Sequence, residues 1–443
     1  MEDNIYDRKS VNSLILYFSV PAVLSLIVEI MASVVDTAFA GHLGPMAVDA
    51  LTAMGLITPI LNLFTAIQAL FAVSTSIFIA RYLNQKERRD EFLLTGMVMS
   101  LVISTVVSGV AYIALDSILN ALGAEGAVYD LAASYLKIQL LSNIFSAMGY
   151  TLTSSIRAFG NPKVEMVITG SSVIVNIIFN AVLVFGFNMG IRGLAYGTLA
   201  SEVICLVFSW VWLSRHHLLP KCHGIRGGRF AICSLELAKL GLAQTAIQAL
   251  GGCTGFFVNN SLIINAGDSY VAVWNVVQNI YTLLLMPTVG ISQGVETIIA
   301  YYGGQGKNDE KRKAIGSTMV LTVLYGLIAS LGIFLFGDRL LSLFVEAPAF
   351  LELAGNVLRI IFATFPLMGV FYTVMTLMEV TEHEVQSVLM ILTRQVFLMV
   401  PLVYLLPRFF SGFQYAIFMS VPIADFLSSA LSIAILAMSR KCR

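Results

Sequence analysis

Six polar side chains lie inside long apolar segments of the sequence, where they could do chemistry. They are Glu29, Asp36, Asn176, Asn180, Thr198 and Glu202. The two carboxylates of the first segment are seven residues apart, about two helical turns, so they share one helix face. The two asparagines of the fifth segment are four residues apart, as are the threonine and glutamate of the sixth. Because oxygen ligands suit hard cations, these groups could together hold a proton or a sodium ion.

Asp36 is the strongest of these candidates. A carboxylate in hydrocarbon costs about 2.5–3.5 kcal/mol on insertion scales, so such residues usually face a cavity, a partner or water. Asp36 lies about 22 residues into its segment, so a simpler interpretation is that it marks the membrane exit. For each asparagine or threonine the simpler role is an interhelical hydrogen bond worth about 0.6 kcal/mol. The polar residues that accompany Asp36 favour a functional role for it.

Composition places these residues in a membrane. The 443-residue chain is 58% hydrophobic and 12% charged, whereas soluble domains carry about 25% charged residues. The formal net charge is zero, which gives a nucleic-acid partner no electrostatic support. The five cysteines form no CxxC pair and no HExxH motif occurs, so we expect neither a metal site nor a cofactor. We also expect that the protein is not an enzyme.

Apolar windows of about 20 residues or more predict about twelve membrane-spanning helices. The windows are 12–41, 50–80, 92–120, 132–157, 164–187, 192–213, 235–266, 270–302, 314–337, 354–379, 384–407 and 412–438. A polar, basic stretch at 214–234 divides them six and six. We therefore expect an all-α polytopic membrane protein with an N-terminal six-helix lobe (1–213), a cytoplasmic linker (214–234) and a pseudo-symmetric C-terminal six-helix lobe (235–443).

Lysines and arginines gather in the loops that follow the even-numbered helices. Arg81, Lys86, Arg88 and Arg89, for example, follow the second helix. Because positively charged loops stay on the cytoplasmic side, both termini are expected to be cytoplasmic. The pattern predicts a multi-pass protein of the plasma membrane, in direct contact with the lipid bilayer.

The two halves of the sequence resemble each other. The second helix ends IFIARYLNQKERRDE and the eighth ends TIIAYYGGQGKNDEK. The first helix ends VVDTAFAGHLG and the seventh ends VNNSLIINAGD, which places Asn259 or Asn260 opposite Asp36 as an accessory candidate. Arg394 lies deep in the eleventh segment, where we expect it to have a partner, and Pro21 allows a kink in the first helix. Such repeats are typical of transporters with a cavity between two halves.

Five stretches carry a resemblance to a known family. They are VDTAFAGHLG (35–44), SIRAFGNPK (155–163), NIIFNAVLVFGFNMGIRGLAYGTLASE (176–202), MPTVGISQGVETIIAYYGGQGKNDEKRKA (286–314) and LTRQVFLMVPLVYLLP (392–407). With these motifs in order on a twelve-helix frame, the chain resembles the multidrug and toxic compound extrusion (MATE) family over nearly its whole length. The resemblance implies a monomer with two lobes in a V. It also implies export of organic cations or amphipathic small molecules in exchange for H⁺ or Na⁺.

The resemblance also implies roles for individual residues. In one branch of the family, a helix 1 aspartate, two helix 5 residues and a helix 6 threonine form the cation site. These map to Asp36, Asn176, Asn180 and Thr198, and a helix 1 proline tied to bending maps to Pro21. The chain departs from the pattern at Asn180, where the family usually has an aspartate. A site with one clear carboxylate mildly favours a proton over sodium, and Glu29 and Glu202 are possible accessory groups.

A second interpretation is a lipid-linked sugar or lipid flippase, which shares this architecture at the superfamily level. Flippases tend to carry cationic residues in the central cavity to meet pyrophosphate, and Arg394 and Lys137 are the candidates here. An intramembrane enzyme and a channel are weaker interpretations, because the histidines all lie in loops or at helix ends and no filter-like loop occurs. The sequence does not identify the substrate.

Overall fold

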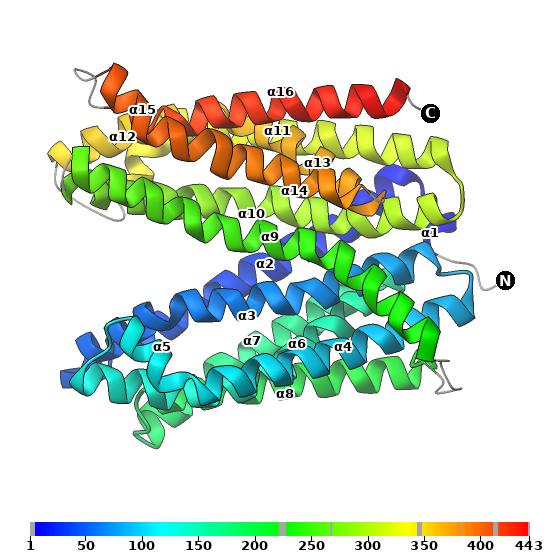
Figure 1. Cartoon of the computed structure of the whole chain (residues 1–443), viewed down its shortest axis with the longest axis horizontal. Coiled ribbons are helices and arrows are strands. Elements are labelled where there is room, and N and C mark those ends of the chain that lie inside the picture. Colours follow the sequence, from blue (N-terminus) through cyan, green and yellow to red (C-terminus); the bar gives the residue numbers. More distant parts are fainter. Residues whose placement is uncertain are drawn as a thin grey trace. The chain divides into compact units, whose positions relative to one another are not determined.

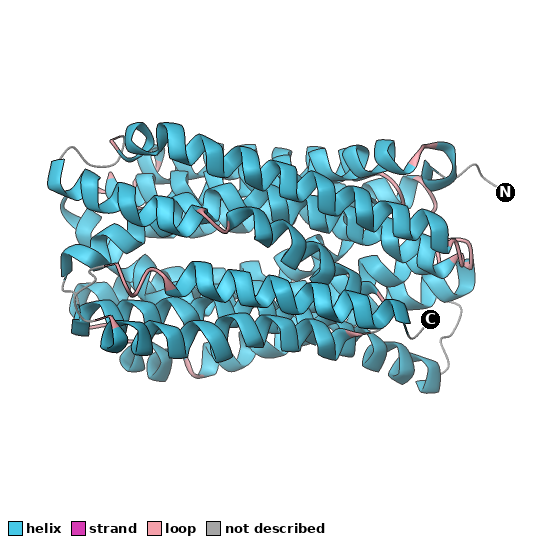
Figure 2. Cartoon of the chain, turned by 90° about the horizontal axis from the view of Figure 1, so that it is seen from above, coloured by secondary structure: helices cyan, strands magenta, loops and turns pink. Residues whose placement is uncertain are grey.

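The structure is a computed structural model that describes residues 5–220, 227–265, 268–342, 348–381, 383–410 and 415–441. All the regular elements in these ranges are helices, and no strand occurs in them (Figure 2). The all-α prediction is confirmed. Contacts within the chain divide it into two compact units, residues 1–9 with 24–245 and residues 10–23 with 246–443.

The first unit contains the elements of the N-terminal half. They are α1 (Ile5–Arg8), part of α2 (Val11–Gly41), η1 (Gly44–Met46), α3 (Ala47–Arg81), α4 (Lys86–Ile113), α5 (Leu115–Ala121), α6 (Gly126–Ala158), α7 (Pro162–Ala181), η2 (Val182–Gly186), α8 (Ile191–Arg215) and part of α9 (Gly227–Asn265). Helix α6 packs against α3, α4 and α8, and α7 packs against α8 (Figure 1). An apolar core that includes Ile57, Leu136 and Leu194 fills the space between them.

The second unit contains the elements of the C-terminal half. They are the rest of α2 and α9, then α10 (Asp268–Gly304), α11 (Asn308–Leu341), α12 (Pro348–Phe362), α13 (Phe365–Val380), α14 (Glu384–Leu392), η3 (Thr393–Met399), α15 (Val400–Phe409) and α16 (Ser420–Lys441). Helix α11 packs against α10 and α13, and α16 packs against α13 and η3. The core of this unit is mainly aliphatic and includes an aromatic group, in which Phe362 stacks on Phe365 at 4.7 Å between ring centroids.

Helices α2 and α9 each contribute to both units. In the second unit, the Ser19 hydroxyl of α2 donates to the Ile291 carbonyl at 3.4 Å, and a Cβ on Gly294 would come within 2.8 Å of the Ser19 backbone. In the first unit, the Thr245 hydroxyl of α9 donates to the Ala66 carbonyl at 3.1 Å. The unit borders therefore fall inside helices, whereas the predicted lobes 1–213 and 235–443 have their border in the linker; those lobes stay a prediction.

Nine helices in the described ranges are long and apolar enough to cross a membrane, or ten if α12 and α13 count as one broken span. Helices α6 and α9, with 33 and 39 residues, are not among these nine. The sequence predicted one unbroken helix over 354–379, but α12 and α13 are bent by 42°. Pro366 explains the break, because it lacks an amide hydrogen and restricts the backbone of the residue before it.

The helices on both sides extend into the range predicted for the linker, 214–234. Helix α8 extends to Arg215 and α9 already begins at Gly227, while 221–226 lie outside the described residues. Cys233, Leu237 and Leu240 are all buried, and their spacing of four and three residues is that of one helix face. A hydropathy window does not detect the first turns of α9, before residue 235, because charged residues on the opposite helix face lower the average.

A π-helical segment occurs in the fifth helix of each half. In the first unit η2 directly follows α7, and in the second unit η3 interrupts the helix between α14 and α15. Such segments are rare and are frequently found at functional sites. Each lies next to a group of polar side chains.

Candidate functional site

The first polar cluster joins α2 to α7 in the first unit. Asn180 Nδ2 donates to Asp36 Oδ1 at 2.5 Å and also lies 3.1 Å from Asn176 Oδ1. Asn176 Nδ2 in turn donates to Thr198 Oγ1 on α8 at 3.4 Å. The structure thus brings together the four residues predicted to form the coupling site: Asp36, Asn176, Asn180 and Thr198.

The local structure of α7 explains how the two asparagines reach one site. They are four residues apart and lie on the buried face of the helix, with Asn180 fully buried and Asn176 nearly so. The π-helical segment η2 begins two residues after Asn180, and its Phe185 makes an edge-to-face contact with Phe39 of α2 at 5.3 Å. Helix α2 therefore contacts α7 through a hydrogen bond and the adjoining η2 through an aromatic contact.

Gly197 is a part of the site that the sequence analysis missed. A Cβ at this position of α8 would collide with the side-chain oxygen of Asn180 and come within 2.8 Å of its Cγ. Only a glycine leaves room for the Asn180 amide between α7 and α8. Its position directly before Thr198 in the stretch GTLASE does not by itself indicate this role, which depends on the neighbouring helix.

The hydrogen-bond directions show what the cluster can do. A carboxylate accepts hydrogen bonds only, so the amide nitrogen of Asn180 is correctly placed to stabilise an ionised Asp36. The other amide atom, Asn180 Oδ1, is buried and has no hydrogen-bond partner among the described residues. Rotation of this amide would turn its oxygen toward Asp36, where it could accept from a protonated carboxyl group or coordinate a cation.

Several predicted accessory residues lie outside this cluster. Glu29 is exposed and Glu202 is half-buried, and in the described part of the chain no hydrogen bond links either to Asp36. Pro21 is buried in the portion of α2 that belongs to the second unit, and the helix continues through it. Asn260 belongs to the second unit, where it donates to the Tyr404 hydroxyl at 3.0 Å, and the Asn259 side chain lies outside the described residues.

A second polar cluster lies in the second unit. Arg394 of η3 donates through Nε to Asp425 Oδ1 of α16 at 2.8 Å, and Nη2 lies 2.8 Å from the same oxygen. Nη2 also donates to the Tyr281 hydroxyl at 3.4 Å. The expected partner of Arg394 is therefore Asp425, which sequence analysis did not single out. The sequence contained a sign of this pairing, because one apolar segment carries an arginine and the next carries a carboxylate, and such charges inside a membrane usually pair.

The sequence also contains a GxSxG pattern, Gly290-Ile-Ser-Gln-Gly294, that the sequence analysis overlooked. In hydrolases this motif places the serine on a sharp turn between a strand and a helix. Here it lies inside α10, and its glycines serve close packing, because a Cβ on Gly290 would come within 2.8 Å of Val23. Ser292 is buried, so the pattern does not describe a nucleophile.

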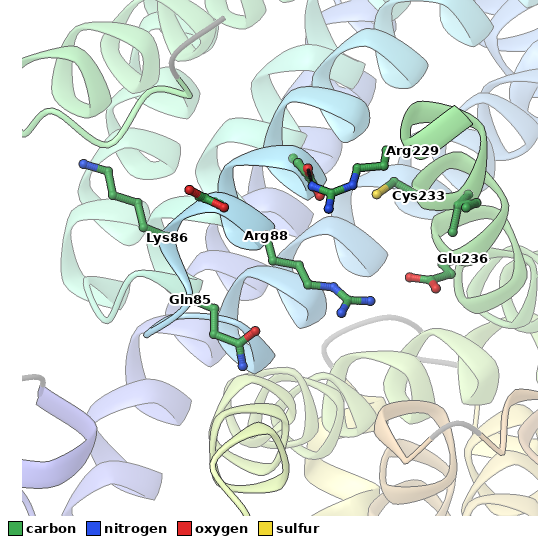
Figure 3. A pocket seen from close by; sticks show the side chains of 9 residues that line it. Gln85, Lys86, Arg88, Arg229, Cys233 and Glu236 are labelled. Carbon is green, nitrogen blue, oxygen red and sulfur yellow. Dashed lines mark hydrogen bonds and ion pairs between the residues drawn. The ribbon is translucent and has the colours of Figure 1, made fainter. Parts of the chain in front are cut away.

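A pocket of about 620 Å³ lies in the first unit between the start of α4 and the start of α9. Figure 3 shows Arg88, Arg229 and Glu236 around this space, and Arg229 forms an ion pair with Glu91 at 2.7 Å. Its lining carries three basic and three acidic side chains, which balance in charge, and none of the predicted site residues. The pocket has the character of a solvated surface.

Comparison with known families gives a match over most of the chain. The model of the MatE family matches residues 21–182 and 246–405. The two matched stretches correspond to the two halves of the internal repeat.

Two similar proteins are multidrug export proteins. Multidrug export protein MepA from Staphylococcus haemolyticus is 23% identical over 427 residues, covering 96% of this chain and 93% of MepA. MepA from Staphylococcus aureus strain MRSA252 is 23% identical over 409 residues, covering 91% and 89% of the two chains.

The solved structures agree on the fold. One is an outward-facing multidrug resistance MATE family transporter of the MOP superfamily, with a TM-score of 0.92, 19% identity and coverage of 100% of this chain and 98% of that one. Another is a MOP superfamily transporter from Pyrococcus furiosus, with a TM-score of 0.88, 20% identity and coverage of 98% and 96%. The twelve-helix fold of these transporters is thus the fold of this chain. The chain belongs to the MatE family of multidrug efflux transporters and is a multi-pass membrane protein.

Proposed function

We propose that this protein is a secondary antiporter that exports organic cations or amphipathic small molecules in exchange for protons, with sodium as the alternative coupling ion. The hydrogen bond between Asn180 and Asp36 is the observation that carries the proposal. It couples the one carboxylate of the cluster to the packing of α2 on α7. A change in the charge of Asp36 therefore changes a contact between two membrane-spanning helices.

The coupling step is a proton transfer to Asp36. A protonated carboxyl oxygen is a weaker acceptor than a carboxylate, so the bond from Asn180 weakens when Asp36 is neutralised. The Asn180 amide then rotates, and its unpaired oxygen accepts from the new carboxyl hydrogen. Helix α2 shifts relative to α7, and this change in helix packing expels the substrate. Loss of the proton to the cytoplasm restores the first arrangement.

Sodium would use the same oxygens. The rotated Asn180 amide, Asn176, Thr198 and Asp36 supply four oxygen atoms for a hard cation. One carboxylate and three neutral groups form a weaker cation site than two carboxylates would, which favours the proton. An Asn180→Asp variant, with two carboxylates in the cluster, is expected to gain sodium dependence.

The remaining features of the proposal follow the family and the positive-inside rule. We expect a monomer in the plasma membrane with both termini cytoplasmic, no nucleic-acid partner, no enzymatic activity and no cofactor besides the coupling ion. The flippase alternative is less well supported, because Lys137 is exposed, so of the two candidate cations Arg394 alone would have to meet the several negative charges of a pyrophosphate.

The test is gradient-driven uptake of a fluorescent organic cation into inside-out vesicles, under a proton gradient and then under a sodium gradient. Asp36→Asn is expected to abolish uptake driven by either gradient. Asp116→Asn is the matched control, since this exposed aspartate of α5 only accepts a hydrogen bond from Tyr129. Gradient-driven uptake retained by Asp36→Asn would refute the proposal.

A further inference from the structure

The ion pair between Arg394 and Asp425 is incomplete as a structural salt bridge. Both Nε and Nη2 of the guanidinium contact one oxygen, Oδ1, while Oδ2 is buried and has no hydrogen-bond partner among the described residues. A buried ion pair offsets its desolvation only when the remaining lone pairs and protons are also satisfied. In the bidentate geometry that is frequent for stable arginine–carboxylate pairs, both carboxylate oxygens would accept a hydrogen bond.

The same geometry leaves Nη1 of the guanidinium without an acceptor among the described residues, while one face of the group lies over the Phe371 ring, 5.8 Å from its centroid. Arginine has five N–H donors, and Nη1 makes no hydrogen bond to the described residues. At the neighbouring Nη2 the second contact is a long one, 3.4 Å to the Tyr281 hydroxyl. That hydroxyl accepts from Arg394 and keeps its own hydrogen for donation. Both hydrogens of Nη2 are thus used, and two donors, Nη1 and the tyrosine O–H, are left for a ligand.

Burial distinguishes the two partners. The Arg394 side chain is 14% accessible, whereas Asp425 is 1% accessible. Arg394 lies nine residues after the start of the span Val385–Phe409, about 14 Å into the membrane at 1.5 Å per residue. An arginine at this depth faces a protein interior or a water-filled cavity rather than lipid. The accessible part of the pair is therefore positive and the hidden part negative.

The position in the repeat points to function. Asn180 lies two residues before the π-helical segment of the fifth helix, and Arg394 lies in the π-helical segment of the eleventh, the fifth helix of the second half. We propose that Arg394 and the Tyr281 hydroxyl bind the carboxylate group of an amphipathic substrate, and that Asp425 is a positioning residue that holds the guanidinium. The proposal rests on the proposed export function for the nature of its ligand, and extends the substrate class to compounds that carry a carboxylate beside their cationic group.

The test uses two dyes that differ only at the carboxyl group. Rhodamine 110 has a free carboxylate and rhodamine 123 is its methyl ester, so the ratio of their dissociation constants isolates the anionic contact. Binding is measured by fluorescence polarisation to the full chain in nanodiscs of phosphatidylcholine, without any gradient. Since no gradient is applied, this result and the transport result with Asp36→Asn stand independently of each other.

The decisive variant is the double substitution Arg394→Gln with Asp425→Asn, which removes both charges and avoids a lone buried ion. It is expected to weaken rhodamine 110 binding about tenfold and to change rhodamine 123 binding less than twofold. Asp425→Asn alone is expected to weaken rhodamine 110 binding and to leave rhodamine 123 binding nearly unchanged, because the guanidinium loses the carboxylate that positions it. A purely structural pair would shift both dyes alike in every variant.

Arg359→Gln is the matched control. It removes another arginine of the second unit that is paired with an aspartate, Asp338, and it is expected to leave the ratio unchanged. The proposal is overturned if the double variant binds rhodamine 110 as the unaltered protein does. It is also overturned if the double variant loses both dyes equally.

Discussion

The polar clusters of the two units both lie at the π-helical segment of a fifth helix, but a neutral amide stands there in the first unit and an arginine in the second. In the first unit, a carboxylate on α2 accepts a hydrogen bond from an asparagine next to η2. In the second unit, an arginine within η3 is held by a carboxylate on α16. In the first cluster the ionisable group is half-exposed and the amide is buried, whereas in the second the guanidinium is accessible and the carboxylate is hidden. An internal repeat can thus keep its backbone irregularity while the side chains on it diverge.

The difference matters because a proton can neutralise only one of the two clusters. Asp36 with an amide partner has a neutral state in which all groups can be satisfied. Protonation of Asp425 would instead leave an unpaired arginine, which cannot lose its own proton. The first cluster is suited to ion coupling and the second to recognition of a permanent charge.

The largest expected effect is on the free energy of unfolding when the second cluster loses one of its two charges. Arg394→Gln alone should destabilise the protein by about 3–5 kcal/mol, because it leaves the buried Asp425 without its counter-ion, whereas the double variant with Asp425→Asn should be near neutral. Unfolding in mild detergent, followed by tryptophan fluorescence, measures the difference. The exposed pair of Arg359 and Asp338 provides the control, since its removal should cost about 0–1 kcal/mol. Equal costs for the single and double variants would mean that Asp425 is solvated in the folded state.

Packing around the first cluster gives an intermediate effect. Gly197→Ala places a methyl group against the Asn180 amide, and overpacking of this kind costs about 1–3 kcal/mol. The displaced amide can no longer donate to Asp36, so proton-driven uptake should fall together with stability. Gly170→Ala on α7, where a Cβ would meet no atom within 4 Å, is the matched control. Normal proton-driven uptake in Gly197→Ala would show that the bond between Asn180 and Asp36 is dispensable for coupling.

Sequence reasoning identified the first cluster because each of its members stands out in an apolar segment and the helical spacing puts the members on common faces. It could not find Gly197, since a missing side chain matters only once the neighbouring helix is in place. Asp425 was missed for a related reason, because its significance comes from Arg394 on another helix. The all-α fold followed from hydropathy, but the break before Pro366 and the early start of α9 depend on packing that a window average does not detect.

The smallest predicted effect is at the edge of the first cluster. Thr198→Val removes the hydroxyl that accepts from Asn176 at 3.4 Å, and an interhelical hydrogen bond in a membrane is worth about 0.6 kcal/mol. Unfolding should therefore change very little, and proton-driven uptake should persist, because the bond between Asn180 and Asp36 stays intact. Sodium-driven uptake should be lost if sodium is the coupling ion, since the variant removes one of four oxygens. Comparing the two gradients in Thr198→Val, with Ser201→Ala as a neighbouring hydroxyl control, thus separates proton transfer at one carboxylate from coordination of a metal ion by the whole cluster.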